Sequence, residues 1–121
     1  PYWVTGTTTF GSANAQALVI DDPNVEFNIQ VTSSTTVTHA ASVAQTDLNR
    51  NVNFLIAAGS TASGQSGTSL DMATIADTAT LNCKLLRLAA IPGNVFGLNF
   101  NNAIVLFNNH QLKGGTGTAG T

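Results

Sequence analysis

The sequence predicts an all-β fold, an antiparallel β-sandwich or barrel with at most one short helix. Short β-prone segments are separated by turns and loops, one of them alternates cleanly between apolar and polar residues, and only Ala40–Asn51 has helical character. Short strands at such intervals are typical of sandwiches and barrels. We expect a single β domain over residues 1–113, followed by a flexible Gly/Thr tail over residues 114–121.

The clearest strand is Val25–Thr32, where apolar and polar residues alternate. Period two places the apolar side chains on one face, as in a half-buried strand. The run Ala15–Ile20 is expected to pair with it. Asp21–Asn24 lies between the two and has a turn composition, because Pro fixes its own φ and Asp and Asn side chains bond nearby backbone groups. A calcium loop of the EF-hand type is disfavoured, since it needs more oxygen ligands at set spacing.

Other segments complete the predicted fold. Gly59–Ser69 is rich in Gly and Ser and is expected to be a flexible, solvated loop. Ile91–Asn94 contains Pro and Gly and is expected to turn. Lys113–Thr121 has no side chain that would anchor it, so we expect it to be mobile unless a partner holds it. Further β-prone segments are Val4–Phe10, Val52–Ala57, Thr78–Leu88 and Asn102–Leu112.

Charge is unusually sparse. Charged residues make up 8% of the chain and the net charge is −2, against about 25% charged residues in a typical domain. A nucleic-acid-binding domain normally carries excess positive charge, so we do not expect nucleic acid as a partner. No apolar run approaches the roughly 18 residues of a membrane span, and no membrane association is expected.

The residues supply no recognisable catalytic or metal-binding motif. His39 and His110 are not at metal-ligand spacing, and Glu26 is the only glutamate. Cys83 is the only cysteine and lies in an apolar run, so we expect a small core residue rather than a nucleophile. We therefore predict that the protein is not an enzyme and uses no cofactor and no metal.

Tyr2 and Trp3 allow a second interpretation, because aromatic side chains stack on sugar rings. A carbohydrate-binding β-sandwich is thus an alternative. Adjacent residues on a strand point to opposite faces, however, so packing against the core or against a partner is the favoured role of this pair.

Several segments, taken in order, resemble small virion proteins of tailed bacteriophages that are encoded beside the major capsid protein. The similar segments cover nearly the whole chain: PYWVTGTTTFGS from Pro1, ALVIDDPNVEFNIQ from Ala17, AAGSTASGQSGTSLD from Ala57, and LNCKLLRLAAIPGNVFGLNFNNAIVLFNNHQL from Leu81. We interpret these relatives as head decoration, or cement, proteins. The resemblance implies that a further N-terminal region precedes Pro1. The chain departs from its relatives around Thr46–Asn51.

The resemblance implies a structural protein on the capsid exterior that binds the major capsid protein and stabilises contacts between its subunits. It also implies a homo-oligomer, either a trimer or a dimer. A minor tail or fibre component is a further alternative. Interface cores are depleted of charge and enriched in aromatic residues, which fits this composition. The expected contact residues are Tyr2, Trp3, Phe96, Phe100, Lys113 and Thr116.

Overall fold

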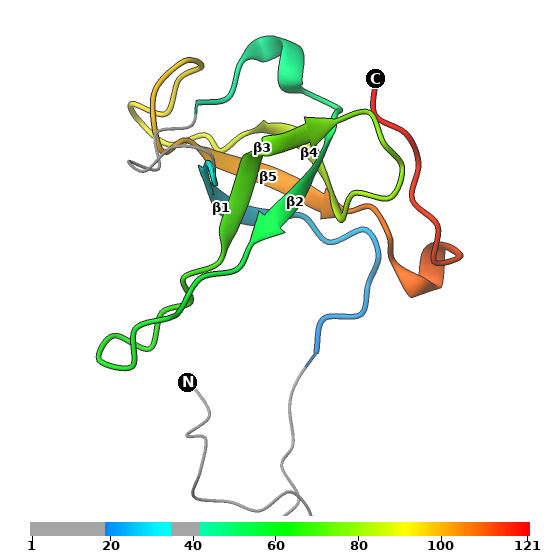
Figure 1. The fold of residues 1–121 in the computed structure, drawn as a ribbon, viewed down its shortest axis with the longest axis horizontal. Coiled ribbons are helices and arrows are strands. Elements are labelled where there is room, and N and C mark those ends of the chain that lie inside the picture. Colours follow the sequence, from blue (N-terminus) through cyan, green and yellow to red (C-terminus); the bar gives the residue numbers. More distant parts are fainter. Residues whose placement is uncertain (1–18, 35–41) are drawn as a thin grey trace, which may run out of the picture.

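Five strands close into a small barrel in the computed structural model, which describes residues 19–34 and 42–121 (Figure 1). Their order around the barrel is β1-β3-β2-β4-β5. The β1–β3 pair is parallel and the other pairs are antiparallel. The prediction of an all-β fold is confirmed. The strands are β1 (Phe27–Thr32), β2 (Asn51–Leu55), β3 (Ser69–Ala76), β4 (Cys83–Leu88) and β5 (Asn102–Phe107).

The helical content of the described residues is limited to two short 3-10 turns, η1 (Gln45–Asp47) and η2 (Gln111–Lys113). In the described part of Ala40–Asn51, where the sequence permits a short helix, the only helical element is η1. It is closed at its start by the Asp47 carboxylate, which accepts a hydrogen bond from the Ala44 N–H at 2.8 Å. It ends at once, because the backbone of Leu48 is extended.

β1 follows the predicted alternation. Glu26, Asn28 and Gln30 are exposed, whereas the apolar residues between them are partly or fully buried. The predicted turn before β1 is also confirmed, because the Asp22 carboxylate accepts a hydrogen bond from the Asn24 N–H at 2.8 Å. The structure describes only residues 19 and 20 of the strand that was expected over Ala15–Ile20, and for these two residues the prediction is wrong.

Val19 and Ile20 lie outside any strand and are 79% and 62% exposed. The partners of β1 are instead β3 and β5. A run of apolar residues next to a turn does not reveal which distant strand will fill the neighbouring position in the sheet.

The barrel interior is one apolar cluster to which every strand contributes. Val31, Val52, Leu70, Leu85 and Val105 are all buried in it. Burying a large aliphatic side chain stabilises a fold by about 1.5–3 kcal/mol, so this cluster is the main source of stability.

Cys83 belongs to the same cluster and is fully buried, as predicted. Burial raises the pKa of its thiol to about 12. The thiol is therefore protonated and weakly nucleophilic at neutral pH.

Two strand predictions need correction. β3 was missed, and the strand expected over Thr78–Leu88 begins only at Cys83. The sequence of β3 hides its pattern because it contains a buried carboxylate, that of Asp71. The backbone N–H groups of Ser34 and Ala73 satisfy this carboxylate at 2.9 and 3.1 Å.

The final strand is shorter than the predicted Asn102–Leu112 and ends at Phe107. The next residue, Asn108, leaves the sheet direction, and its side-chain amide donates hydrogen bonds to the carbonyl groups of Ala79 and Leu81. Residues 108 and 109 then form a bend, and η2 takes up the last two residues of the predicted strand.

The loop expected over Gly59–Ser69 is an exposed hairpin arm between β2 and β3 (Figure 1). An isolated bridge joins Ser60 and Gln65 near its tip. Gly67 allows the two sides of the arm to approach closely, since a Cβ at this position would lie 2.4 Å from the Ala58 carbonyl oxygen.

The C-terminal segment 114–121 does not extend away from the barrel as a tail without an anchor. It runs along the barrel, and barrel side chains hold its backbone (Figure 1). The Asn108 side-chain oxygen accepts a hydrogen bond from the Thr118 N–H at 3.0 Å, and the Asn51 side-chain amide donates to the Thr118 carbonyl at 2.8 Å. The hydrogen-bond partners of this Gly/Thr segment thus come from neighbouring side chains, while its flexibility stays a prediction.

Candidate interaction surface

Large apolar side chains are exposed together on the loop that connects β4 and β5. We call residues 91–100 the apolar loop. Monomeric proteins rarely expose contiguous apolar patches unless these bind something. The exposed fractions lie between 42% and 56% for Ile91, Val95, Phe96, Leu98 and Phe100.

Asn101 fixes the end of the apolar loop from inside the protein. It is 2% exposed. Its amide group donates to the Asn94 side-chain oxygen and to the Val95 carbonyl, both at 2.9 Å. Its side-chain oxygen accepts from the N–H of the buried Val43 at 3.0 Å. One asparagine thus ties the loop to the segment before η1.

Asn94 fixes the other part of the loop. Its amide group donates to the carbonyl groups of Ala89 and Asn102, both at 2.8 Å. Its side-chain oxygen accepts from Asn101 and from the Asn102 N–H. The predicted turn is confirmed, because the Asn94 N–H donates to the Ile91 carbonyl at 3.0 Å.

Backbone geometry completes this support. Gly97 has φ = +82°, a conformation that glycine adopts easily, and its N–H donates to the Val43 carbonyl at 3.0 Å. Phe100 also has a positive φ of 58°, which is uncommon for an aromatic residue. The loop therefore presents its apolar side chains on a backbone that is already ordered, which lowers the entropy cost of binding.

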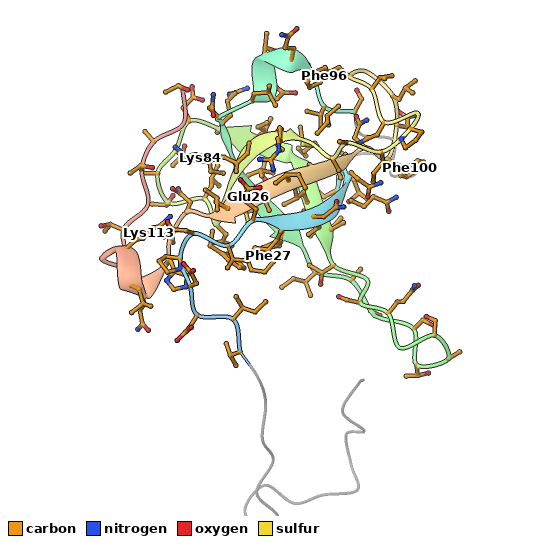
Figure 2. All side chains as sticks on the ribbon, turned by 180° about the vertical axis from the view of Figure 1, so that it is seen from behind. Glu26, Phe27, Lys84, Phe96, Phe100 and Lys113 are labelled. Carbon is orange, nitrogen blue, oxygen red and sulfur yellow. The ribbon has the colours of Figure 1, made fainter. Side chains whose placement is uncertain are left out.

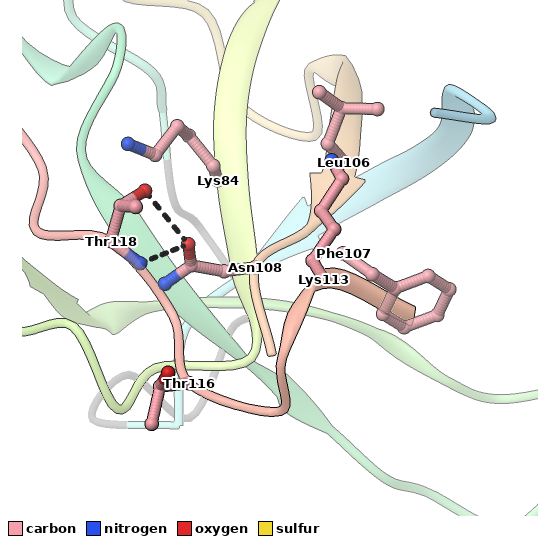
Figure 3. A pocket seen from close by; sticks show the side chains of 7 residues that line it. All are labelled: Lys84, Leu106, Phe107, Asn108, Lys113, Thr116 and Thr118. Atoms are coloured by element: carbon pink, nitrogen blue, oxygen red, sulfur yellow. Dashed lines mark hydrogen bonds between the residues drawn. The ribbon is translucent and has the colours of Figure 1, made fainter. Parts of the chain in front are cut away.

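The structure divides the predicted contact residues into separate groups. Phe96 and Phe100 lie together on the apolar loop, while Lys113 lies at the opposite end of the barrel (Figure 2). Thr116 lies near Lys113, and both line the same small pocket (Figure 3). Tyr2 and Trp3 lie outside the described residues.

The pocket beside Lys113 has a volume of about 190 Å³ and is closed on one side by the C-terminal segment. Both described lysines line it. The Lys84 ammonium donates to the Ala119 carbonyl at 3.0 Å. Arg50 pairs with Asp77, and Arg87 pairs with Glu26, whereas neither lysine has an ion pair within residues 19–34 and 42–121. The positive charges without an ion pair in the described residues therefore lie at this end of the barrel, on the two lysines.

Titratable groups do not assemble into a reactive centre in the described part of the chain. His110 uses its Nδ1 atom to accept the Leu112 N–H at 3.1 Å, which caps η2. Within residues 19–34 and 42–121, no group of three or more His, Cys, Asp or Glu side chains is placed to hold a metal ion. What this arrangement offers is an apolar binding surface.

Sequence reasoning found two residues of the apolar loop and missed the others. Ile91, Val95 and Leu98 were not selected, because they lie in a segment with no helical or strand period. The asparagines that hold the loop were missed too. A signal for the loop was present in the sequence, because several Asn residues and two Gly residues surround the apolar side chains of residues 93–102.

Comparison with known proteins finds no matching family model, no matching curated protein and no matching solved structure. Among the described residues, no helix is long and apolar enough to cross a membrane.

Proposed function

We propose that this chain is a structural virion protein that binds the outer surface of a bacteriophage capsid and stabilises contacts between major capsid subunits, as a homo-oligomer on the capsid exterior. The observation that carries this proposal is the apolar loop. Its large side chains are exposed, and the half-buried Asn94 and the buried Asn101 hold its backbone in place. This combination supports a docking surface for another protein.

The energetics of the loop suit a repetitive shell. Fully burying a large apolar side chain is worth about 1.5–3 kcal/mol, so a half-exposed one contributes about 1 kcal/mol when a partner covers it. The loop as a whole then supplies a few kcal/mol per copy. A homo-oligomer that spans several capsid subunits gains further from effective concentration.

Lys113 and Thr116 are proposed as a second contact at the opposite end of the barrel. The unpaired lysines there would meet acidic groups of the capsid surface, which steers association and specificity more than it adds affinity.

The test replaces Phe96 and Phe100 with Ser in the full chain and measures its copy number per major capsid protein in purified virions by quantitative mass spectrometry. We expect wild-type protein at a simple ratio to the capsid protein and a loss of at least about tenfold in the double variant. Ile56→Ser is the matched control, because Ile56 is 82% exposed but lies outside the apolar loop.

Normal decoration by the double variant would remove the apolar loop from the proposal. A few wild-type copies per virion would instead indicate a minor tail or fibre component. Complete absence from virions would overturn the virion assignment, and a glycan array would then test the carbohydrate-binding alternative.

A further inference from the structure

The barrel has a slot on one side, between β1 and the strand that follows the hairpin arm. β1 and β3 pair only at Val31–Leu70 and Thr32–Asp71. Continuing this parallel register would pair residues 27–30 with residues 66–69, but no such pairs form. Among the strands of the described ranges 19–34 and 42–121, residues 27–30 pair with β5 alone, so β1 and β3 diverge here. We call the gap between residues 27–30 and residues 66–69 the slot.

The β1 side of the slot presents backbone groups that no described strand pairs with. The Val31 N–H donates to the Asn101 carbonyl at 2.9 Å, and Ile29 is opposite Ala103. In an antiparallel pair the residues that exchange hydrogen bonds alternate, so the odd-numbered residues of β1 face β5. The N–H and C=O groups of Asn28 and Gln30 therefore face the slot, where no strand of the described chain pairs with them.

Hollows lie on both faces of the sheet at the slot. The inner one, of about 290 Å³, is lined by apolar side chains that include Phe27, Ile29 and Phe107. The outer one, of about 340 Å³, includes Gln30 and is more polar. Ser66 and Thr68 border both hollows. This is the arrangement expected at a vacant strand position, because a strand places alternate side chains on opposite faces of a sheet.

The chemistry of an occupant follows from this lining. None of the described residues that line either hollow is charged. The occupant must be an extended, uncharged segment, with apolar side chains on one face and small polar side chains on the other. Main-chain hydrogen bonds to the β1 edge would supply affinity, as in other cases of strand addition.

We infer that the slot receives residues 4–10 of a second copy of this chain. In an extended conformation Val4 and Phe10 fall on one face, and Thr5, Thr7 and Thr9 fall on the other. No charged side chain occurs between residues 2 and 18. This run therefore matches both the neutral lining and the two-faced character of the slot.

The direction of the preceding chain favours a second copy over the same copy. Val19 and Ile20 are largely exposed, and the stem that contains them leads away from the barrel in both views (Figures 1 and 2). The residues between Phe10 and Phe27 can span about 50 Å when extended, which is enough to reach a neighbouring barrel. The exchange would specify how copies associate, so it rests on the homo-oligomer part of the proposed function.

Disulfide trapping in the full chain tests the exchange without any capsid. Gln30→Cys lines the outer hollow and is combined in turn with Thr5→Cys, Thr7→Cys or Thr9→Cys. A disulfide needs Cα atoms about 4.4–6.8 Å apart, so only the correctly registered partner will react. The matched control combines Gln30→Cys with Thr8→Cys. In an extended segment residue 8 lies on the opposite face from residues 5, 7 and 9, so its side chain would point away from Gln30. Every variant also carries Cys83→Ala, because Cys83 lines the inner hollow and could otherwise react with a cysteine that points into it.

Mixing isotopically heavy and light protein before oxidation identifies the linked chains by mass spectrometry. We expect one of the odd-numbered partners to give heavy–light disulfides at least about tenfold more often than the Thr8→Cys control. No disulfide above that control would overturn the inference. Disulfides confined to single chains would overturn exchange between copies.

Separate substitutions distinguish this inference from the proposed function. Phe10→Asp places a charge in the apolar inner hollow and should reduce the oligomer fraction measured by light scattering. Phe96→Asp should weaken capsid decoration and leave the oligomer fraction unchanged. An unchanged oligomer fraction in the Phe10→Asp variant would contradict strand exchange, whatever happens on the capsid.

Discussion

Replacing Asn101 with Ala should release the apolar loop from the barrel. The substitution removes hydrogen bonds to Asn94, Val95 and Val43, at distances of 2.9, 2.9 and 3.0 Å. Each such bond contributes about 0.5–1.5 kcal/mol net, and the buried Val43 N–H would lose its partner. We therefore expect the free energy of unfolding to fall by about 2–4 kcal/mol.

Urea unfolding measures this change, and amide hydrogen exchange at Val43 localises it. Asn99→Ala is the control, because Asn99 is exposed on the same loop and its loss should change stability by no more than about 0.5 kcal/mol. A loss below about 1 kcal/mol for Asn101→Ala, with Val43 still protected, would refute the reasoning that this residue supports the loop.

Other substitutions probe the remainder of the fold. Phe107→Ala removes edge-to-face contacts at 5.1 and 5.8 Å with two other Phe rings and should cost about 1–3 kcal/mol in urea unfolding, because the ring is partly exposed. Burial raises the pKa of Asp71, but hydrogen bonds from Ser34 and the Ala73 amide outweigh it, so the pKa lies below its ordinary value of 3.8. The ionised Asp71 carboxylate therefore contributes fully to the free energy of unfolding above pH 3.8, and this contribution is lost as pH falls through the folded-state pKa. Asp71→Asn should accordingly make the free energy of unfolding depend less on pH at the acid end of a stability–pH profile. Asn108→Ala should free the C-terminal segment, since Asn108 holds Thr118, and carboxypeptidase digestion should then proceed faster than in wild type.

Sequence reasoning succeeded where local physics decides the structure. Period two in β1 and the Asp22 turn involve neighbours along the chain, so both could be predicted. β3 could not, because the pattern is broken by a carboxylate whose partners include Ser34, a residue far away in the sequence. The end of β5 at Phe107 could not be predicted either, because it also depends on a distant contact. Asn108, the residue after β5, bonds to the Ala79 carbonyl in the loop before β4.

The candidate surface was predictable only in part. Exposure of Phe96 and Phe100 is not visible in a sequence, where an apolar aromatic residue is expected inside as readily as outside. What places them outside is the asparagine pair Asn94 and Asn101, which holds the loop backbone over the barrel end. Polar side chains that bond to backbone groups leave little periodic signal, so such supports remain hidden until the chain is folded.

The position of β1 also has a kinetic consequence. Its partners are β3, in the middle of the chain, and β5, near its end, so the first described strand can be completed only after the last has been made. Non-local pairing of this kind slows folding to the range of milliseconds to seconds. A nascent chain that lacks β5 would display unpaired strand edges in the meantime. Variants truncated before residue 102 should therefore aggregate during synthesis rather than form a smaller barrel.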